Sequence, residues 1–197
     1  MILKPERKPL RKLLLTSVTI LSADVCLAHG FGGSGFLHPL TGIDHLMAMI
    51  AVGAWSAQLG GKAIFRVPAS FLIMMCLGGL IGIKNFHIGY IEFGIALSVV
   101  LLGAAIAINK KTAWFFAAMA VGLFGFCHGY SHGAEIPQQQ HITAYIIGFL
   151  VTTLGLHVAG AVGGLLLLEE RNGENILRGL GTVTAAIGIF LLLKLLK

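Results

Sequence analysis

The sequence predicts an all-α protein, a helical bundle that crosses a lipid bilayer several times. Of the 197 residues, 56% are hydrophobic and only 11% are charged, whereas about 25% are charged in a typical soluble domain. The apolar residues occur in long runs, and Lys and Arg lie at the ends of these runs and in the N-terminal tail. We therefore predict a polytopic membrane protein, and we exclude a nucleic-acid-binding surface despite the net charge of +6.

The N-terminus has the pattern of a cleavable signal peptide at 1–28. A basic segment is followed by the short apolar stretch LLLTSVTIL, and Ala28 ends a small-residue pattern with Cys26 at position minus three. Cleavage would make His29 the first residue of the mature chain, and 29–197 would form one domain of six transmembrane helices. The alternative is an uncleaved anchor helix, which would leave the orientation of the later helices unchanged.

Six apolar segments follow the glycine-rich stretch GFGGSGF. Each is close to the length of about 20 residues that a helix needs to cross a bilayer. Small residues at four-residue spacing within these segments predict close packing between the helices. The expected helices cover about 38–58, 66–83, 88–108, 112–132, 142–168 and 176–196.

The basic residues between these segments predict the orientation of the bundle. With the mature N-terminus outside, six Lys and Arg fall in cytoplasmic connections and three fall on the outer side, in agreement with the positive-inside rule. Both ends of the mature chain are then outside. The cytoplasmic residues are Lys62, Arg66, Lys110, Lys111, Arg171 and Arg178, and the outer residues are Lys84, Lys194 and Lys197.

Two octets place ionisable residues inside this apolar chain: HPLTGIDH at 38–45 and HGYSHGAE at 128–135. The orientation puts the first octet at the outer end of the first helix and the second octet at the outer end of the fourth. A helix turns by about 100° per residue, so His128, His132 and Glu135, spaced i, i+4 and i+7, share one ridge. We therefore expect the two octets to meet at one face of the membrane.

The first octet and the third helix add four further candidates. His38 and His45 lie seven residues apart, on one stripe of the expected first helix, and Asp44 points about 100° away from His45. Glu92, at the start of the third helix, falls on the same membrane face. Ionisable residues within spans are costly and usually face the bundle interior or a water-filled path. We therefore expect the carboxylates to converge with the histidines.

Imidazole together with carboxylate favours borderline divalent ions such as nickel, cobalt or zinc. A carboxylate could also hold a ligand imidazole in the required tautomer. Several weak nitrogen and oxygen sites in series bind an ion strongly enough to strip its water and still release it. The alternative is a structural His–carboxylate network that joins the first and fourth helices. The candidate metal-binding residues are His38, Asp44, His45, Glu92, His128, His132 and Glu135.

Other polar residues have simpler explanations. His157, in the middle of the expected fifth helix, could hydrogen-bond across helices or line an ion path. His87 and His141 lie near loops and are expected to be ordinary interfacial histidines. The pattern GYSHG matches G-x-S-x-G, but that motif works only on a strand-to-helix elbow. Because it lies here within a predicted helix, we reject Ser131 as a nucleophile.

The two octets resemble the motifs of the HupE/UreJ family, the hydrogenase and urease accessory membrane proteins regarded as nickel permeases. The resemblance runs from about His29 to the C-terminus and includes FCHGYSHGAE. It implies a six-helix permease domain at 29–197, in a bacterial inner membrane, with both mature termini in the periplasm. It also implies that the residues of the two octets, and less directly Glu92, form the path of a transported Ni²⁺ or Co²⁺. Cys127 departs from the family pattern, where a larger apolar residue is expected, and could add a soft ligand.

The sequence therefore predicts a permease for a divalent metal ion and not an enzyme. No prosthetic group is expected, and the protein would supply the maturation proteins of nickel enzymes indirectly. One alternative is an intramembrane zinc-dependent hydrolase that uses the same histidines and glutamate. A bis-histidine haem carrier fits less well, because the histidines cluster with carboxylates. The preferred metal, the coupling to an ion gradient and the possibility of a homo-oligomer stay open.

Overall fold

The computed structural model describes residues 33–84, 86, 88–109, 111–136 and 141–197. Within these ranges the regular structure is α-helical, and no strand is present. The predicted signal peptide at 1–28 and His87 lie outside the described residues. The helices are α2 (Gly33–Thr41), α3 (Ile43–Leu59), α4 (Ala63–Gly82), α5 (Ile91–Ile108), α6 (Trp114–Ala134), α7 (Ile142–Leu168) and α8 (Gly173–Leu195).

Five of the described helices, α4 to α8, are long and apolar enough to cross a membrane, and their bounds agree with the expected segments to within about three residues. The prediction of one continuous first helix at 38–58 is wrong. The chain bends by 90° between α2 and α3, and the two pass the same test only as one broken span. The break falls at Gly42, whose extended backbone interrupts the helix before Ile43.

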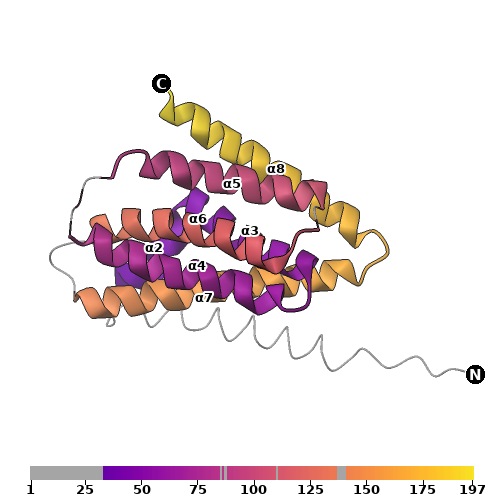
Figure 1. Ribbon diagram of the computed structural model, residues 1–197, viewed down its shortest axis with the longest axis horizontal. Coiled ribbons are helices and arrows are strands. Elements are labelled where there is room, and N and C mark those ends of the chain that lie inside the picture. Colours follow the sequence, from indigo (N-terminus) through magenta and orange to yellow (C-terminus); the bar gives the residue numbers. More distant parts are fainter. Residues whose placement is uncertain (1–32, 85, 87, 110, 137–140) are drawn as a thin grey trace, which may run out of the picture.

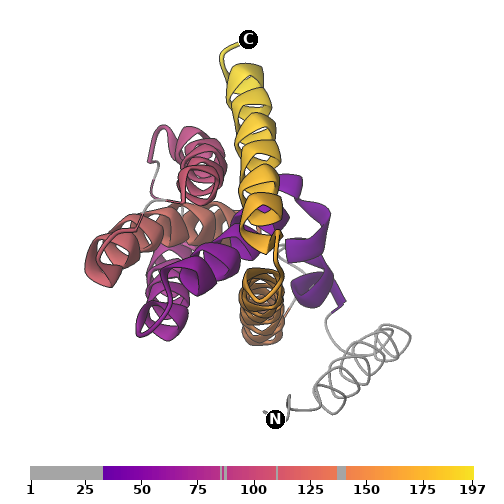
Figure 2. The ribbon, with the colours of Figure 1, turned by 90° about the vertical axis from the view of Figure 1, so that its right-hand side faces the viewer.

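The helices run alternately in opposite directions through the bundle. α4 and α6 end, and α5 and α7 begin, at the end of the bundle on the left of Figure 1. The most extensive helix–helix interfaces are those of α4 with α6, α5 with α8, and α3 with α7. Figure 2 shows α8 at one side of the bundle, with its C-terminal part extending beyond the other helices. The outer surface carries many exposed Phe, Leu, Ile and Val side chains, as expected for a surface that faces lipid.

Glycines make the interface between α4 and α6 very close. A Cβ added to Gly129 would lie 2.0 Å from the carbonyl oxygen of Met75, and a Cβ added to Gly133 would lie 2.3 Å from that of Gly79. These distances leave no room for any side chain, so the two backbones are in direct contact. Because Gly129 and Gly133 directly follow His128 and His132, this contact fixes the depth and rotation of the turns that carry both histidines.

Not every glycine of the spans serves helix packing. Gly155, Gly163 and Gly179 would have no atom within 4 Å of an added Cβ, apart from their own helix and chain neighbours. The packing prediction is therefore correct for the α4–α6 interface and wrong for these three positions.

We expect Gly129→Ala to destabilise the protein by about 1–3 kcal/mol, because the new methyl group would force the α4 and α6 backbones apart. The measurement is the Tm of detergent-purified protein. Gly155→Ala is the matched control, since its methyl group meets open space, and its Tm should equal or exceed that of the parent. Equal Tm values for the two variants would contradict the close contact.

Candidate metal centre

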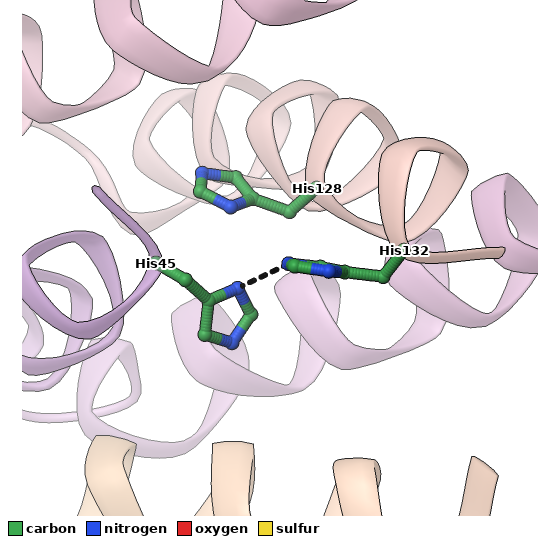
Figure 3. Close-up of side chains that lie close together, drawn as sticks. All are labelled: His45, His128 and His132. Carbon is green, nitrogen blue, oxygen red and sulfur yellow. Dashed lines mark hydrogen bonds between the residues drawn. The ribbon is translucent and has the colours of Figure 1, made fainter. Parts of the chain in front are cut away.

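Three histidines from two helices lie together at one end of the bundle. His45 lies in the first turn of α3, whereas His128 and His132 lie in the last two turns of α6. One ring nitrogen from each of them lies within 4.8 Å of the others. His45 and His128 are fully buried and His132 is half-buried. Figure 3 shows the three rings around a common space, so the structure brings together three of the seven candidate residues.

A hydrogen-bond chain fixes the tautomer of His128. Ser98 in α5 donates its hydroxyl hydrogen to the carbonyl oxygen of Ile95 at 2.6 Å, and its Oγ lies 3.0 Å from His128 Nε2. A hydroxyl has only one hydrogen, so Oγ accepts from Nε2, which carries the ring proton. His128 Nδ1 therefore keeps its lone pair, and this buried atom has no hydrogen-bond partner among the described residues. The ring edge with Nδ1 faces His45 and His132 in Figure 3.

Thr153 in α7 fixes the tautomer of His45 in the same way. Its Oγ1 donates to the carbonyl oxygen of Phe149 at 2.8 Å and lies 3.4 Å from His45 Nε2. The hydroxyl oxygen is again the acceptor, so His45 Nε2 carries the proton and Nδ1 keeps its lone pair. His45 Nδ1 lies 3.2 Å from His132 Nε2, the contact drawn in Figure 3. Without a metal, a proton on His132 Nε2 therefore joins these two rings.

Glu135 lies on the other side of the His132 ring. Its Oε2 is 3.6 Å from His132 Nδ1, the nitrogen remote from His45. A carboxylate in this position favours a proton on Nδ1, which leaves Nε2 available to a metal. The proton between His45 and His132 must leave before both rings can coordinate, because only an unprotonated ring nitrogen binds a metal.

His45 Nδ1, His128 Nδ1 and His132 Nε2 are therefore the ligand atoms of a candidate metal centre. The second nitrogen of each ring contacts a different polar group, an arrangement common among metal-binding histidines. With metal–nitrogen bonds of about 2.0–2.1 Å, nitrogens in a tetrahedral site lie about 3.4 Å apart. The contact of 3.2 Å between His45 and His132 matches this spacing. The three ligand atoms lie within 4.8 Å of one another, so they have to move closer together to bind one ion.

A polar pocket of about 230 Å³ lies beside the histidines. His128 and His132 line it together with the acidic residues Asp44, Glu92 and Glu135. Three carboxylates give the pocket a negative potential that attracts a divalent cation. At about 30 Å³ per water molecule, the pocket can hold an ion that still keeps several of its waters.

Ser131 lies close to two of these carboxylates. Its hydroxyl donates to Glu92 Oε1 at 2.9 Å and also lies 3.4 Å from Glu135 Oε1. Glu92 at the start of α5 and Glu135 at the end of α6 are thereby held at one side of the pocket. Ser131 lies inside the continuous helix α6, so the predicted position of the GYSHG motif within a helix, and not on a strand-to-helix elbow, is confirmed.

The break at Gly42 changes the placement of the two remaining candidates. Asp44 lies in the first turn of α3, where its Oδ1 accepts a hydrogen bond from the backbone N–H of His45 at 2.7 Å. Its charge complements the positive end of the helix, and the residue lines the pocket. His38 lies on α2, beyond the break, so the stripe expected for His38 and His45 does not form. The side chain of His38 lies outside the described part of the structure.

The sequence did not identify the residues that form hydrogen bonds with the histidine rings on the side away from the candidate metal position. Ser98 and Thr153 look like ordinary small polar residues of apolar helices, and each donates to a carbonyl oxygen of its own helix, as such residues commonly do. The contacts of Ser98 with His128 and of Thr153 with His45 depend on which helices are neighbours in the bundle. Phe149 closes the site on the α7 side, with its ring centroid 5.0 Å from that of His45 and 4.7 Å from that of His132.

Comparisons with known proteins agree with the sequence motifs. The family described as HupE / UreJ protein matches residues 13–191 of this chain. The chain is also similar to Protein HupE of Rhizobium leguminosarum bv. viciae, with 40% identity over 159 residues, which cover 81% of this chain and 83% of that protein. No solved structure matches the chain.

We expect Ser98→Ala to weaken the binding of Ni²⁺ or Co²⁺ to purified protein about 10–100-fold, because it removes the acceptor that keeps the His128 proton on Nε2. The measurement is the Kd for each ion in detergent. Ser70→Ala is the matched control: Ser70 Oγ lies 2.7 Å from the carbonyl oxygen of Val67 and 2.9 Å from that of Ala118, remote from the histidines. The tautomer argument would fail if Ser98→Ala and Ser70→Ala bound the ions equally well.

Proposed function

Because the chain belongs to the HupE/UreJ family, we propose that it is a membrane permease that carries a divalent transition-metal ion, nickel or cobalt, towards the cytoplasm. The observation that carries the proposal is the convergence of three imidazole nitrogens beside a pocket lined by three carboxylates. Imidazole binds both ions well, and a negative pocket concentrates cations at its mouth.

The residues of the centre have distinct tasks in this mechanism. Asp44, Glu92 and Glu135 attract the hydrated ion, and the ring nitrogens of His45, His128 and His132 then replace its waters. Three neutral ligands hold a divalent ion less tightly than a closed site of charged ligands does. A permeation site needs this intermediate affinity, because the ion has to leave as well as enter.

An apolar layer separates this centre from the opposite end of the bundle. Met49, Val52, Val99 and Leu102 are at most 1% exposed and belong to one apolar core. A hydrated divalent ion cannot cross such a layer, because its charge would lose its hydration without any replacement. Transport therefore requires a rearrangement of the helices. In the conformation described here, the proposed ion site lies at the end of the bundle where α3 begins.

We propose that this end faces the periplasm of a bacterial inner membrane, with both mature termini on the same side. The excess of Lys and Arg in the opposite connections supports the orientation. The imported metal would supply the maturation of nickel enzymes. All three imidazoles come from one chain, so the centre itself does not require an oligomer.

We expect His132→Ala to reduce nickel uptake at least about tenfold, because it removes one ligand and the partner of Glu135. The measurement is uptake of radiolabelled Ni²⁺ by cells that lack other nickel importers, with Co²⁺ and Zn²⁺ as competitors and with protein abundance in the membrane as a reference. His141→Ala is the control, since His141 is an exposed residue before α7. Uptake at the parental level by His132→Ala would rule out the proposed ligand set.

A metal-exchange experiment distinguishes the permease hypothesis from the hydrolase hypothesis. A catalytic zinc ion also takes three protein ligands and one open position, so the three imidazoles alone would suit either activity. We expect purified protein to lose its metal on dialysis against a chelator and to carry Ni²⁺ or Co²⁺ into liposomes. One zinc ion per chain that resists the chelator, together with no ion flux, would support the hydrolase instead.

A further inference from the structure

His157 is a buried histidine in the middle of α7. It is 1% exposed, and neither Nδ1 nor Nε2 has a hydrogen-bond partner among the described residues. The interpretation of His157 as a residue that hydrogen-bonds across helices is therefore wrong. Buried polar atoms are nearly always paired, because leaving them unpaired costs free energy. An imidazole in this state suggests a ligand that is present only for part of the time.

The position of His157 links it to the metal centre. It follows Thr153, the hydroxyl partner of His45, by four residues, about one helical turn deeper in α7. Its backbone is fixed against α3, since a Cβ added to Gly53 would lie 2.1 Å from the carbonyl oxygen of His157. α7 begins at the end of the bundle where α6 ends, so His157 lies on the inner side of the three histidines.

One aromatic ring contacts both His157 and the candidate metal centre. The ring centroid of Phe71 lies 5.6 Å from that of His128 and 5.2 Å from that of His157. Phe71 comes from α4 and is fully buried. The Phe71 ring therefore packs against both imidazoles and links His157 to the metal-binding cluster.

We infer that His157 is a second, inner ligand of the transported ion, which receives it from His128. The inference rests on the proposed function and adds a site to it. One imidazole completed by water molecules makes a weak site, and weak sites in series let an ion continue instead of being trapped. The ligand class is the same as at the outer centre, a borderline divalent cation.

The test replaces His157 by a residue that cannot bind metal and by one that can. We expect His157→Leu to keep the affinity of the outer centre for Co²⁺ within about twofold, because the two sites do not share ligands. Flux of Ni²⁺ into proteoliposomes should fall at least about tenfold. His157→Met offers a thioether ligand and should retain clearly more flux than His157→Leu. His141→Leu, at the start of the same helix, should behave like the parent.

Three results would overturn the inference. Parental flux in His157→Leu would show that the ion does not need this ligand. Loss of Co²⁺ affinity in proportion to flux would show that His157 only supports the outer centre. A His157→Met variant as inactive as His157→Leu would indicate proton transfer, which a thioether cannot perform. Absence of Ni²⁺ flux in the parent would instead defeat the proposed function itself, and the separate binding measurement distinguishes the two failures.

Discussion

The direct backbone contact between α4 and α6 is the constraint on which the candidate metal centre depends. Gly129 and Gly133 of α6 meet the carbonyl groups of Met75 and Gly79, and a Cβ added to Gly125 would lie 2.4 Å from the carbonyl oxygen of Phe71. The same interface therefore sets the height of the α6 histidines and brings the backbone that carries Phe71 beside them. A shift of α6 along α4 would move ligands, acidic pocket and aromatic ring together.

The bilayer makes the remaining polar contacts necessary. A side chain inside the membrane cannot exchange a lost partner for water, so each imidazole has to find its partners within the bundle. Ser98 from α5, Thr153 from α7 and Glu135 at the end of α6 supply them, each on the side of a ring away from the common space. The groups that prevent the rings from turning are thus the groups that keep one nitrogen of each ring directed at the neighbouring rings.

Much of this arrangement could be predicted from the sequence because it depends on local properties. Apolar runs of about 20 residues give the helices, and the alternating direction of successive helices places both octets at one end. The helical repeat puts His128, His132 and Glu135 on one ridge. The break at Gly42 was not predictable in this way, because a single glycine is tolerated inside many transmembrane helices. The roles of Ser98 and Thr153 depend on which helices are neighbours and in what register, and periodicity carries no information on either.

The placement of charge explains why this centre suits transport better than permanent binding. The ligand nitrogens belong to neutral rings, whereas the carboxylates of Asp44, Glu92 and Glu135 line the outer pocket. An ion bound by the rings therefore keeps most of its charge, in surroundings of low polarity, and is held through attraction towards its side of entry. Inward movement has to work against that attraction. In the proposed transport, a downhill gradient, a coupled ion or a rearrangement that separates the rings from the pocket would therefore drive the step from His128 to His157.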